Sequence, residues 1–157
     1  MSHLFLELLP LGRDQIVPAG LSFWEEGSRA DTVVLLLEGT VHILHSSPSG
    51  EPLLLRVARA GDVLGDIACL DGGARSASLR AATDCRVRSI DAGRFRKFVL
   101  TRPDLLEELL CIQAQRVRSL SRMVTQSHHR AITDQLTSLY NYGFFMERLD
   151  RELERAG

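Results

Sequence analysis

Turn residues divide the stretch from residue 16 to residue 90 into apolar runs that are each about one strand long. The runs cover residues 32–37, 40–45, 53–58, 76–82 and 86–90. Short strands at this spacing, separated by glycine, proline and aspartate, predict a sandwich or barrel-like β body. Gly39, between two of the runs, predicts a tight reversal, because a residue without Cβ adopts positive φ at little cost. A chain of 157 residues has room for one such body and an appendage.

The pattern changes after residue 91, where apolar residues recur at helical spacing, and a long helix is predicted from Pro103. Its interior lacks glycine and proline, and a heptad stripe runs along it. The stripe consists of Leu106, Leu110, Gln113, Val117, Leu120, Val124, Ser127 and Ala131. It is typical of a parallel dimer seam, so we expect a homodimer through residues 103–132. The polar members leave open an ordinary amphipathic helix that packs on its own β body.

Composition narrows the classes of partner. The formal net charge is −1 and the pI is near 6.5, which gives no electrostatic reason to bind nucleic acid. We therefore expect no nucleic-acid partner. No apolar run approaches the ~20 residues that span a bilayer, and the N-terminus lacks the basic start of a secretory signal. The expected location is the cytoplasm, without a membrane partner.

The three cysteines, Cys69, Cys85 and Cys111, are far apart in the sequence. Their spacing fits neither a disulfide framework nor a metal site. They are interpreted as small buried apolar residues. No metal and no resident cofactor is expected.

The stretch GDIACLDGGARSASLRA, residues 65–81, carries the candidate site. Gly65 allows close approach of an anion to the backbone, and Arg75 supplies a fork of donors that matches phosphate oxygens. Ser76 adds a hydroxyl, and the carboxylate of Asp66 suits the hydroxyls of a ribose. Together they predict a sugar-phosphate pocket. Taken singly, Arg75 could be a solvated surface cation and Asp66 a helix N-terminal acid.

The longer segment GDVLGDIACLDGGARSASLRA resembles the phosphate-binding cassette of the cyclic nucleotide-binding domain, and PAGLSFWEEGSRADTVVLLLEGTVHIL resembles that family's opening strands. The resemblance covers residues 16–121. It implies a mainly β fold with α: a cyclic nucleotide-binding β-roll followed by a long C-terminal dimerisation helix.

The resemblance also implies the ligand contacts. Arg75 and Ser76 would bind the phosphate, with Asp66 in the place of the family's ribose-binding glutamate and Leu55 in the base pocket. Backbone amides would assist at Gly65, Ile67, Ala68 and Ala77. The long helix would contribute Arg116, Leu120 and Ser121. The ligand would be cyclic AMP or cyclic GMP.

The tail from residue 133 resembles the opening of the GGDEF domain of diguanylate cyclases. In a complete domain of that family, the residues matching Asn141 and Asp150 would bind guanine. A turn at residues 141–143 followed by an amphipathic helix accounts for the pattern equally well. The tail is far shorter than a domain, and the loops that do the chemistry are missing. We therefore expect this chain not to be an enzyme and to be part of a longer sensor.

Three segments result: a β-roll over residues 1–102, a signalling helix over 103–132 and a GGDEF-like start over 133–157. The predicted function is a sensor that binds a cyclic mononucleotide and transmits occupancy through a dimeric helix to a diguanylate cyclase domain. The alternative is a degenerate β-roll that acts as a ligand-free interaction domain. A transcription factor would need a helix-turn-helix, and the tail has none with a basic recognition face.

Overall fold

The computed structural model describes residues 2–47 and 51–132, with side chains described as far as residue 119. The chain forms two compact units, Met1–Leu109 and Leu110–Gly157, each of which is described by itself. The strands are β1 (Arg13–Val17), β2 (Ser22–Trp24), β3 (Thr32–Glu38), β4 (Thr40–Ser46), β5 (Pro52–Arg59), β6 (Val63–Leu64), β7 (Ser78–Ala81) and β8 (Cys85–Asp91). The helices are α1 (His3–Leu8), a 3-10 turn η1 (Leu9–Leu11), α2 (Asp66–Asp71), α3 (Ala92–Leu100) and α4 (Pro103–Ile132).

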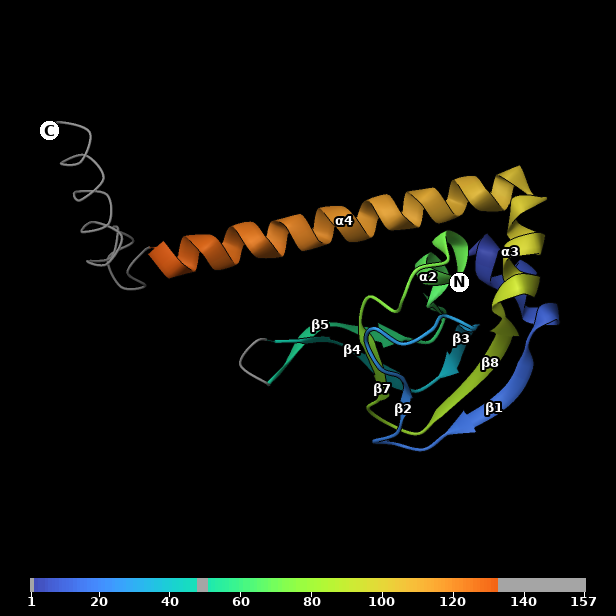
Figure 1. Ribbon diagram of the computed structural model, residues 1–157, viewed down its shortest axis with the longest axis horizontal. Helices are drawn as coiled ribbons and strands as arrows, with labels where there is room; N and C mark the ends of the chain where they lie inside the picture. The colour runs from blue at the N-terminus through green and yellow to red at the C-terminus, as the bar shows by residue number, and fades with distance from the viewer. Residues whose placement is uncertain (1, 48–50, 133–157) are drawn as a thin grey trace, which may run out of the picture. The chain divides into compact units, whose positions relative to one another are not determined.

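The strands form two four-stranded antiparallel sheets, in the orders β1-β8-β3-β6 and β2-β7-β4-β5. Successive strands pass between the sheets, so that the first strand pairs with the last, with Arg13 opposite Ser89 (Figure 1). Only β4 and β5 form a hairpin of consecutive strands within the described residues. The predicted β-roll, with its accompanying helices, is thereby confirmed.

The core lies between the two sheets, because alternate residues of each strand face inward. Its fully buried members come from both sheets: Leu36 and Val87 from one, Val41 and Ala58 from the other. Phe23 and Trp24 are partly buried and pack against this cluster. The strand β2 is therefore packed on this core through Phe23 and Trp24.

All five predicted strands are present, as β3, β4, β5, β7 and β8. The predicted reversal at Gly39 is also present, with φ 93°. A Cβ there would lie 2.5 Å from the carbonyl oxygen of Asp84, so glycine is required sterically as well. β1, β2 and β6 were not among the predicted strand runs. β2 and β6 have three and two residues, too few to establish an alternating pattern.

The short helix α1, also not predicted, is stabilised by its neighbours. The Ser2 side chain accepts a hydrogen bond from the Phe5 amide, and the Leu4 amide donates to Glu108 at 2.7 Å. Leu4 and Phe5 are completely buried. A six-residue helix is marginal alone, so packing and capping hold it.

The long helix α4 begins at Pro103 as predicted and is described to Ile132. Its first turns belong to the first unit, where Leu105 and Leu109 are buried. Further along, Leu110 and Val117 of the heptad stripe are 63% and 61% exposed. The dimer seam and the boundaries after residues 102 and 132 stay predictions.

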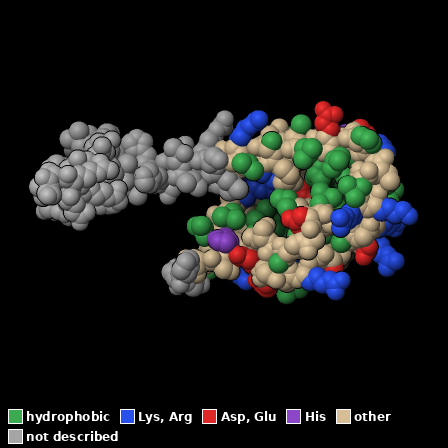
Figure 2. Space-filling model, turned by 45° about the horizontal axis from the view of Figure 1, so that its top comes forward, with side chains coloured by type: hydrophobic (Ala, Val, Ile, Leu, Met, Phe, Trp, Pro, Cys, Tyr) green, Lys and Arg blue, Asp and Glu red, His purple; other side chains and the backbone are tan. Residues whose placement is uncertain are grey.

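The surface of the β-roll carries mixed charge. In the view of Figure 2, apolar side chains gather near the centre of the roll's face and basic side chains lie around its edge.

Cys69 and Cys85 are buried as predicted, whereas Cys111 is exposed on α4, so the prediction of three buried cysteines is wrong. Within the described ranges, no helix is both long enough and apolar enough to cross a membrane.

Candidate functional site

The cassette is built around α2, which lies between two glycines with left-handed backbone. Gly65 precedes the helix with φ 78° and Gly72 follows it with φ 77°. The chain then turns back, and the loop between β2 and β3 pairs with it. The Arg75 amide donates to the Ser28 carbonyl at 2.9 Å, and the Gly27 amide donates to the Arg75 carbonyl at 2.8 Å. These two bonds fix the backbone from which the Arg75 side chain extends.

The Arg75 side chain points inward, and the residue is only 3% exposed. Its Nη2 donates to the carbonyl oxygen of Thr32 at 2.6 Å, and its Nη1 donates to that of Gly65 at 3.2 Å. The carboxylate of Asp31 lies 3.7 Å from Nη2. Arg75 is therefore not a solvated surface cation.

Trp24 covers one face of this guanidinium, with 3.8 Å between the Arg75 Cζ and the centre of the indole. The indole Nε1 donates to the Ala77 carbonyl at 3.2 Å, which ties the ring to the cassette itself. Trp24 was not among the predicted site residues. The available signal was that it is the only tryptophan of the chain, and a partly buried indole N–H needs an acceptor.

Gly65 is explained by these two side chains. A Cβ at this position would lie 2.5 Å from Arg75 Nη1 and 2.8 Å from Trp24 Cη2. Both distances are too short for unbonded atoms. Glycine was predicted because it lets an anion approach the backbone, whereas in the structure it lets the cation and the indole approach.

One donor of Arg75 is left over. The buried Nε has no hydrogen-bond partner among the described residues. A buried donor without an acceptor is destabilising and uncommon in native proteins. Nε is therefore the Arg75 nitrogen that still lacks an acceptor, and an outside acceptor reaches it only when the atoms that cover it move aside.

Cys69 closes the site from α2. Its thiol donates to the same Thr32 carbonyl at 3.4 Å, and Arg75 Nη1 lies 3.9 Å from the sulfur. Burial raises the pKa of the Cys69 thiol, and the nearby Arg75 charge opposes that rise. The thiol therefore acts as a neutral packing group beside the arginine.

The other predicted ligand residues of the first unit have different exposures. Asp66, the first residue of α2, is 2% exposed and has an interaction of its own. Ala68 is buried, whereas Ile67 is 45% exposed. Ser76 is exposed and Ala77 is half-buried.

Leu55 is half-buried on β5. It occupies the bulge at which the pairing of β5 with β4 shifts, between Arg56 opposite Ile43 and Leu54 opposite Leu44.

The remaining predicted residues lie outside this unit. Arg116 belongs to the second unit, where its guanidinium donates to Gln113 at 3.3 Å. Leu120 and Ser121 lie on α4 beyond the last described side chain, and Asn141 and Asp150 lie outside the described residues. The structure brings together Gly65, Asp66 and Arg75, and the roles of all these residues stay predictions.

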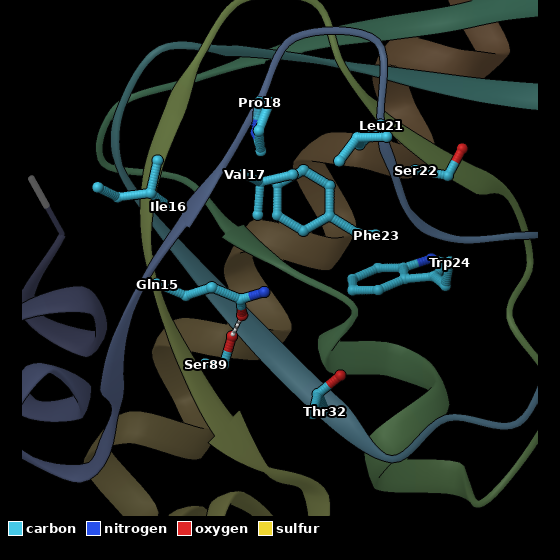
Figure 3. Close-up of a pocket in the computed structure, with 10 residues that line it drawn as sticks. All are labelled: Gln15, Ile16, Val17, Pro18, Leu21, Ser22, Phe23, Trp24, Thr32 and Ser89. Atoms are coloured by element: carbon cyan, nitrogen blue, oxygen red, sulfur yellow. Dashed lines mark hydrogen bonds between the residues drawn. The ribbon is translucent and has the colours of Figure 1, made fainter.

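A shallow hollow of about 270 Å³ borders the site. It is lined by β1 and β2 and by Thr32 and Ser89, and it includes neither Arg75 nor any residue of α2 (Figure 3). Ser89 donates to Gln15 across its floor at 2.9 Å. Trp24 and Thr32, which hold Arg75, are at the same time part of its wall.

Comparison with known proteins agrees with this geometry. The family model described as "Cyclic nucleotide-binding domain" matches residues 15–102, which include all eight strands from Gln15 onward, α2 and Arg75. The chain belongs to the cyclic nucleotide-binding domain family. The cassette described above is thus part of a cyclic nucleotide-binding domain.

Two curated relatives of this domain are transcriptional regulators. A CRP-like cAMP-activated global transcriptional regulator of Mycobacterium tuberculosis is 31% identical over 101 residues, covering 64% of this chain and 45% of the regulator. The cAMP-activated global transcriptional regulator CRP of Escherichia coli is 30% identical over 108 residues, covering 68% and 51%. The chain thus spans about half the length of the curated relatives it matches.

Solved structures share the fold. The catabolite activator protein of Thermus thermophilus superposes with a TM-score of 0.70 at 20% identity, covering 82% of this chain and 61% of that one. An EAL enzyme in a cAMP-bound form superposes with a TM-score of 0.57 at 22% identity, covering 74% and 31%.

These relatives correct one prediction. The prediction that the protein has no nucleic-acid partner is wrong, because the curated relatives are global regulators of transcription. The net charge of a single domain was a poor guide, since a regulator's sensing domain can be neutral while another part of the protein meets nucleic acid.

Proposed function

We propose that this chain is the sensing part of a signalling protein and that it binds a cyclic mononucleotide, cAMP or cGMP, at residues 65–77. The observation that carries the proposal is Arg75, a buried cation beside Gly65 whose Nε lacks an acceptor among the described residues. The curated relatives are named as cAMP-activated regulators, which supports a cyclic nucleotide as the class of ligand.

The proposed roles follow from charge and hydrogen-bonding capacity. The cyclic phosphate carries a negative charge, and a hydrogen bond from a guanidinium to such a group is about twice as strong as a neutral one. Ser76, which is exposed beside Arg75, supplies a hydroxyl to the same phosphate. Asp66 is the ribose ligand of the proposal, and Leu55 contacts the base.

Transmission in this proposal runs through α4. Ligand must contact one placement of the helix better than another, because a ligand with equal affinity for both states shifts nothing. Arg116, Leu120 and Ser121 are the helix residues proposed to make that contact. A homodimer through residues 103–132 would pass the change to the output.

The proposed output is a diguanylate cyclase domain that follows this chain. The tail's resemblance to the start of a GGDEF domain, with Asn141 and Asp150 at the guanine-binding positions, supports this proposal. The resemblance concerns only the output and leaves the proposed nucleotide site unchanged.

Calorimetric titration of the whole chain with cAMP and with cGMP tests the proposal. We expect saturable heat with at least one nucleotide, and its loss in Arg75→Leu. Because Arg75 is buried, circular dichroism must establish that the variant is folded. Arg96→Leu, which removes an exposed arginine from α3, is the matched control and should bind as the wild type does. Absence of heat with both nucleotides at high concentration would refute the sensor and favour a ligand-free interaction domain.

A further inference from the structure

The protein itself holds the guanidinium of Arg75 by several contacts. Both terminal nitrogens of Arg75 donate to backbone carbonyls, those of Thr32 and Gly65, and the indole of Trp24 stacks on the guanidinium at 3.8 Å. The indole is itself held by its hydrogen bond to the Ala77 carbonyl. The guanidinium therefore has one position and one orientation before any ligand arrives.

A phosphate could meet this arginine in two ways. It could draw the guanidinium out of its position, or it could accept from the guanidinium where it already lies. The first way breaks the hydrogen bonds to the carbonyls of Thr32 and Gly65, a longer one to the Thr32 hydroxyl and the indole stack. Each lost hydrogen bond would weaken binding by on the order of tenfold or more. The second way breaks none of them and gives Nε an acceptor, and it requires only that the atoms covering Nε move aside. The second is favoured.

We infer that Trp24 is a positioning residue of the nucleotide site, which holds the guanidinium of Arg75 so that Nε donates to the ligand's phosphate. The inference rests on the proposed function, because it concerns the same arginine and the same ligand class. Trp24 acts through Arg75 and not through the base: its ring covers the guanidinium, and its N–H is already used by Ala77.

The indole also reports on the site. Trp24 is the only tryptophan, so all tryptophan emission comes from a ring in contact with the proposed phosphate ligand. A phosphate at Nε changes the electrostatic field at that ring without moving it far. Emission should therefore change on nucleotide addition and saturate together with the heat.

Two substitutions separate the aromatic face from the rest of the side chain. Trp24→Phe and Trp24→Leu both lose the hydrogen bond to Ala77, but only phenylalanine keeps a face on which Arg75 can stack. We expect Trp24→Leu to weaken nucleotide affinity about tenfold and Trp24→Phe to stay within about threefold of the wild type. Phe23→Leu is the control, because it removes an aromatic neighbour of Trp24, 6.3 Å away between ring centroids, and leaves the stack of Trp24 on Arg75 in place. The affinity of this variant for nucleotide should be unchanged.

The measurement is calorimetry at a temperature where every variant is folded, with cAMP and cGMP as ligands, alongside tryptophan emission of the wild type. Equal nucleotide affinities of Trp24→Leu and Trp24→Phe overturn the inference. Tighter binding by Trp24→Leu than by the wild type also overturns it, because the indole would then block the ligand's access to Arg75. If Trp24→Leu does not fold, wild-type emission that stays constant while heat saturates overturns the inference. No heat from the wild type overturns the proposed function itself.

Discussion

Gly65→Ala is the substitution whose effect on the free energy of unfolding follows most directly from the structure. Alanine at φ 78° is in the left-handed region, which costs about 1–2 kcal/mol. The new Cβ would also lie 2.5 Å from Arg75 Nη1 and 2.8 Å from Trp24 Cη2. Moving the guanidinium aside sacrifices its hydrogen bond to the Gly65 carbonyl, about 1.5–3 kcal/mol for a charged donor. We expect a total loss of about 2.5–5 kcal/mol in the free energy of unfolding.

Gly72→Ala is the matched control at the other end of α2. Its φ is 77°, but no atom lies within 4 Å of the Cβ that alanine would add. The backbone cost of about 1–2 kcal/mol should then be the whole effect. Urea unfolding followed by circular dichroism measures both variants against the wild type. If the two substitutions destabilise the protein equally, the contact of Arg75 and Trp24 with Gly65 does not hold in solution.

Three further outcomes are expected. The hydrogen bond from Arg102 lowers the pKa of Asp104 from 3.8 to about 2, so its stabilising effect is complete above pH 3.8 and is lost as pH falls through about 2. Thermal melts of the wild type and Asp104→Asn should therefore differ at pH 5 and converge toward about pH 2. A thiol reagent should label Cys111 rapidly in the native protein, and labelling of the two buried cysteines should require unfolding. If α4 is a dimer seam, light scattering should find a dimer that Val117→Glu dissociates and Ser119→Glu, off the stripe, does not; a wild-type monomer at every concentration would refute the seam.

What could be predicted from the sequence depended on how far apart the relevant residues lie. The strand runs and α4 were predictable because alternation and helical spacing are local signals. The cassette was found because Gly65 and Arg75 are close in the sequence. The acceptor of Arg75, Thr32, is 43 residues away and becomes a partner only through the β-roll.

Features that depend on distant neighbours could not be predicted from the local sequence. The helix α1 exists because Leu4 and Phe5 are buried against other elements, a contribution that six residues of sequence do not reveal. The burial of Cys111 was predicted from residue type, but its position on the exposed side of α4 decides otherwise. The partner class of the whole protein was judged from one domain's charge, which does not determine it.

The pairing of β1 with β8 has a consequence for biosynthesis. The side chains of Gln15 and Ser89 are hydrogen-bonded across this pair although the two residues lie 74 positions apart in the chain. Such non-local pairing makes folding slow, because a long loop must close before the contact can form. On the ribosome, the first strand must wait for the last before the sheet can be completed. The cassette arginine is made before β8, which pairs with the strand β3 that carries its acceptor Thr32, so a nascent chain cannot sense ligand until β8 has emerged.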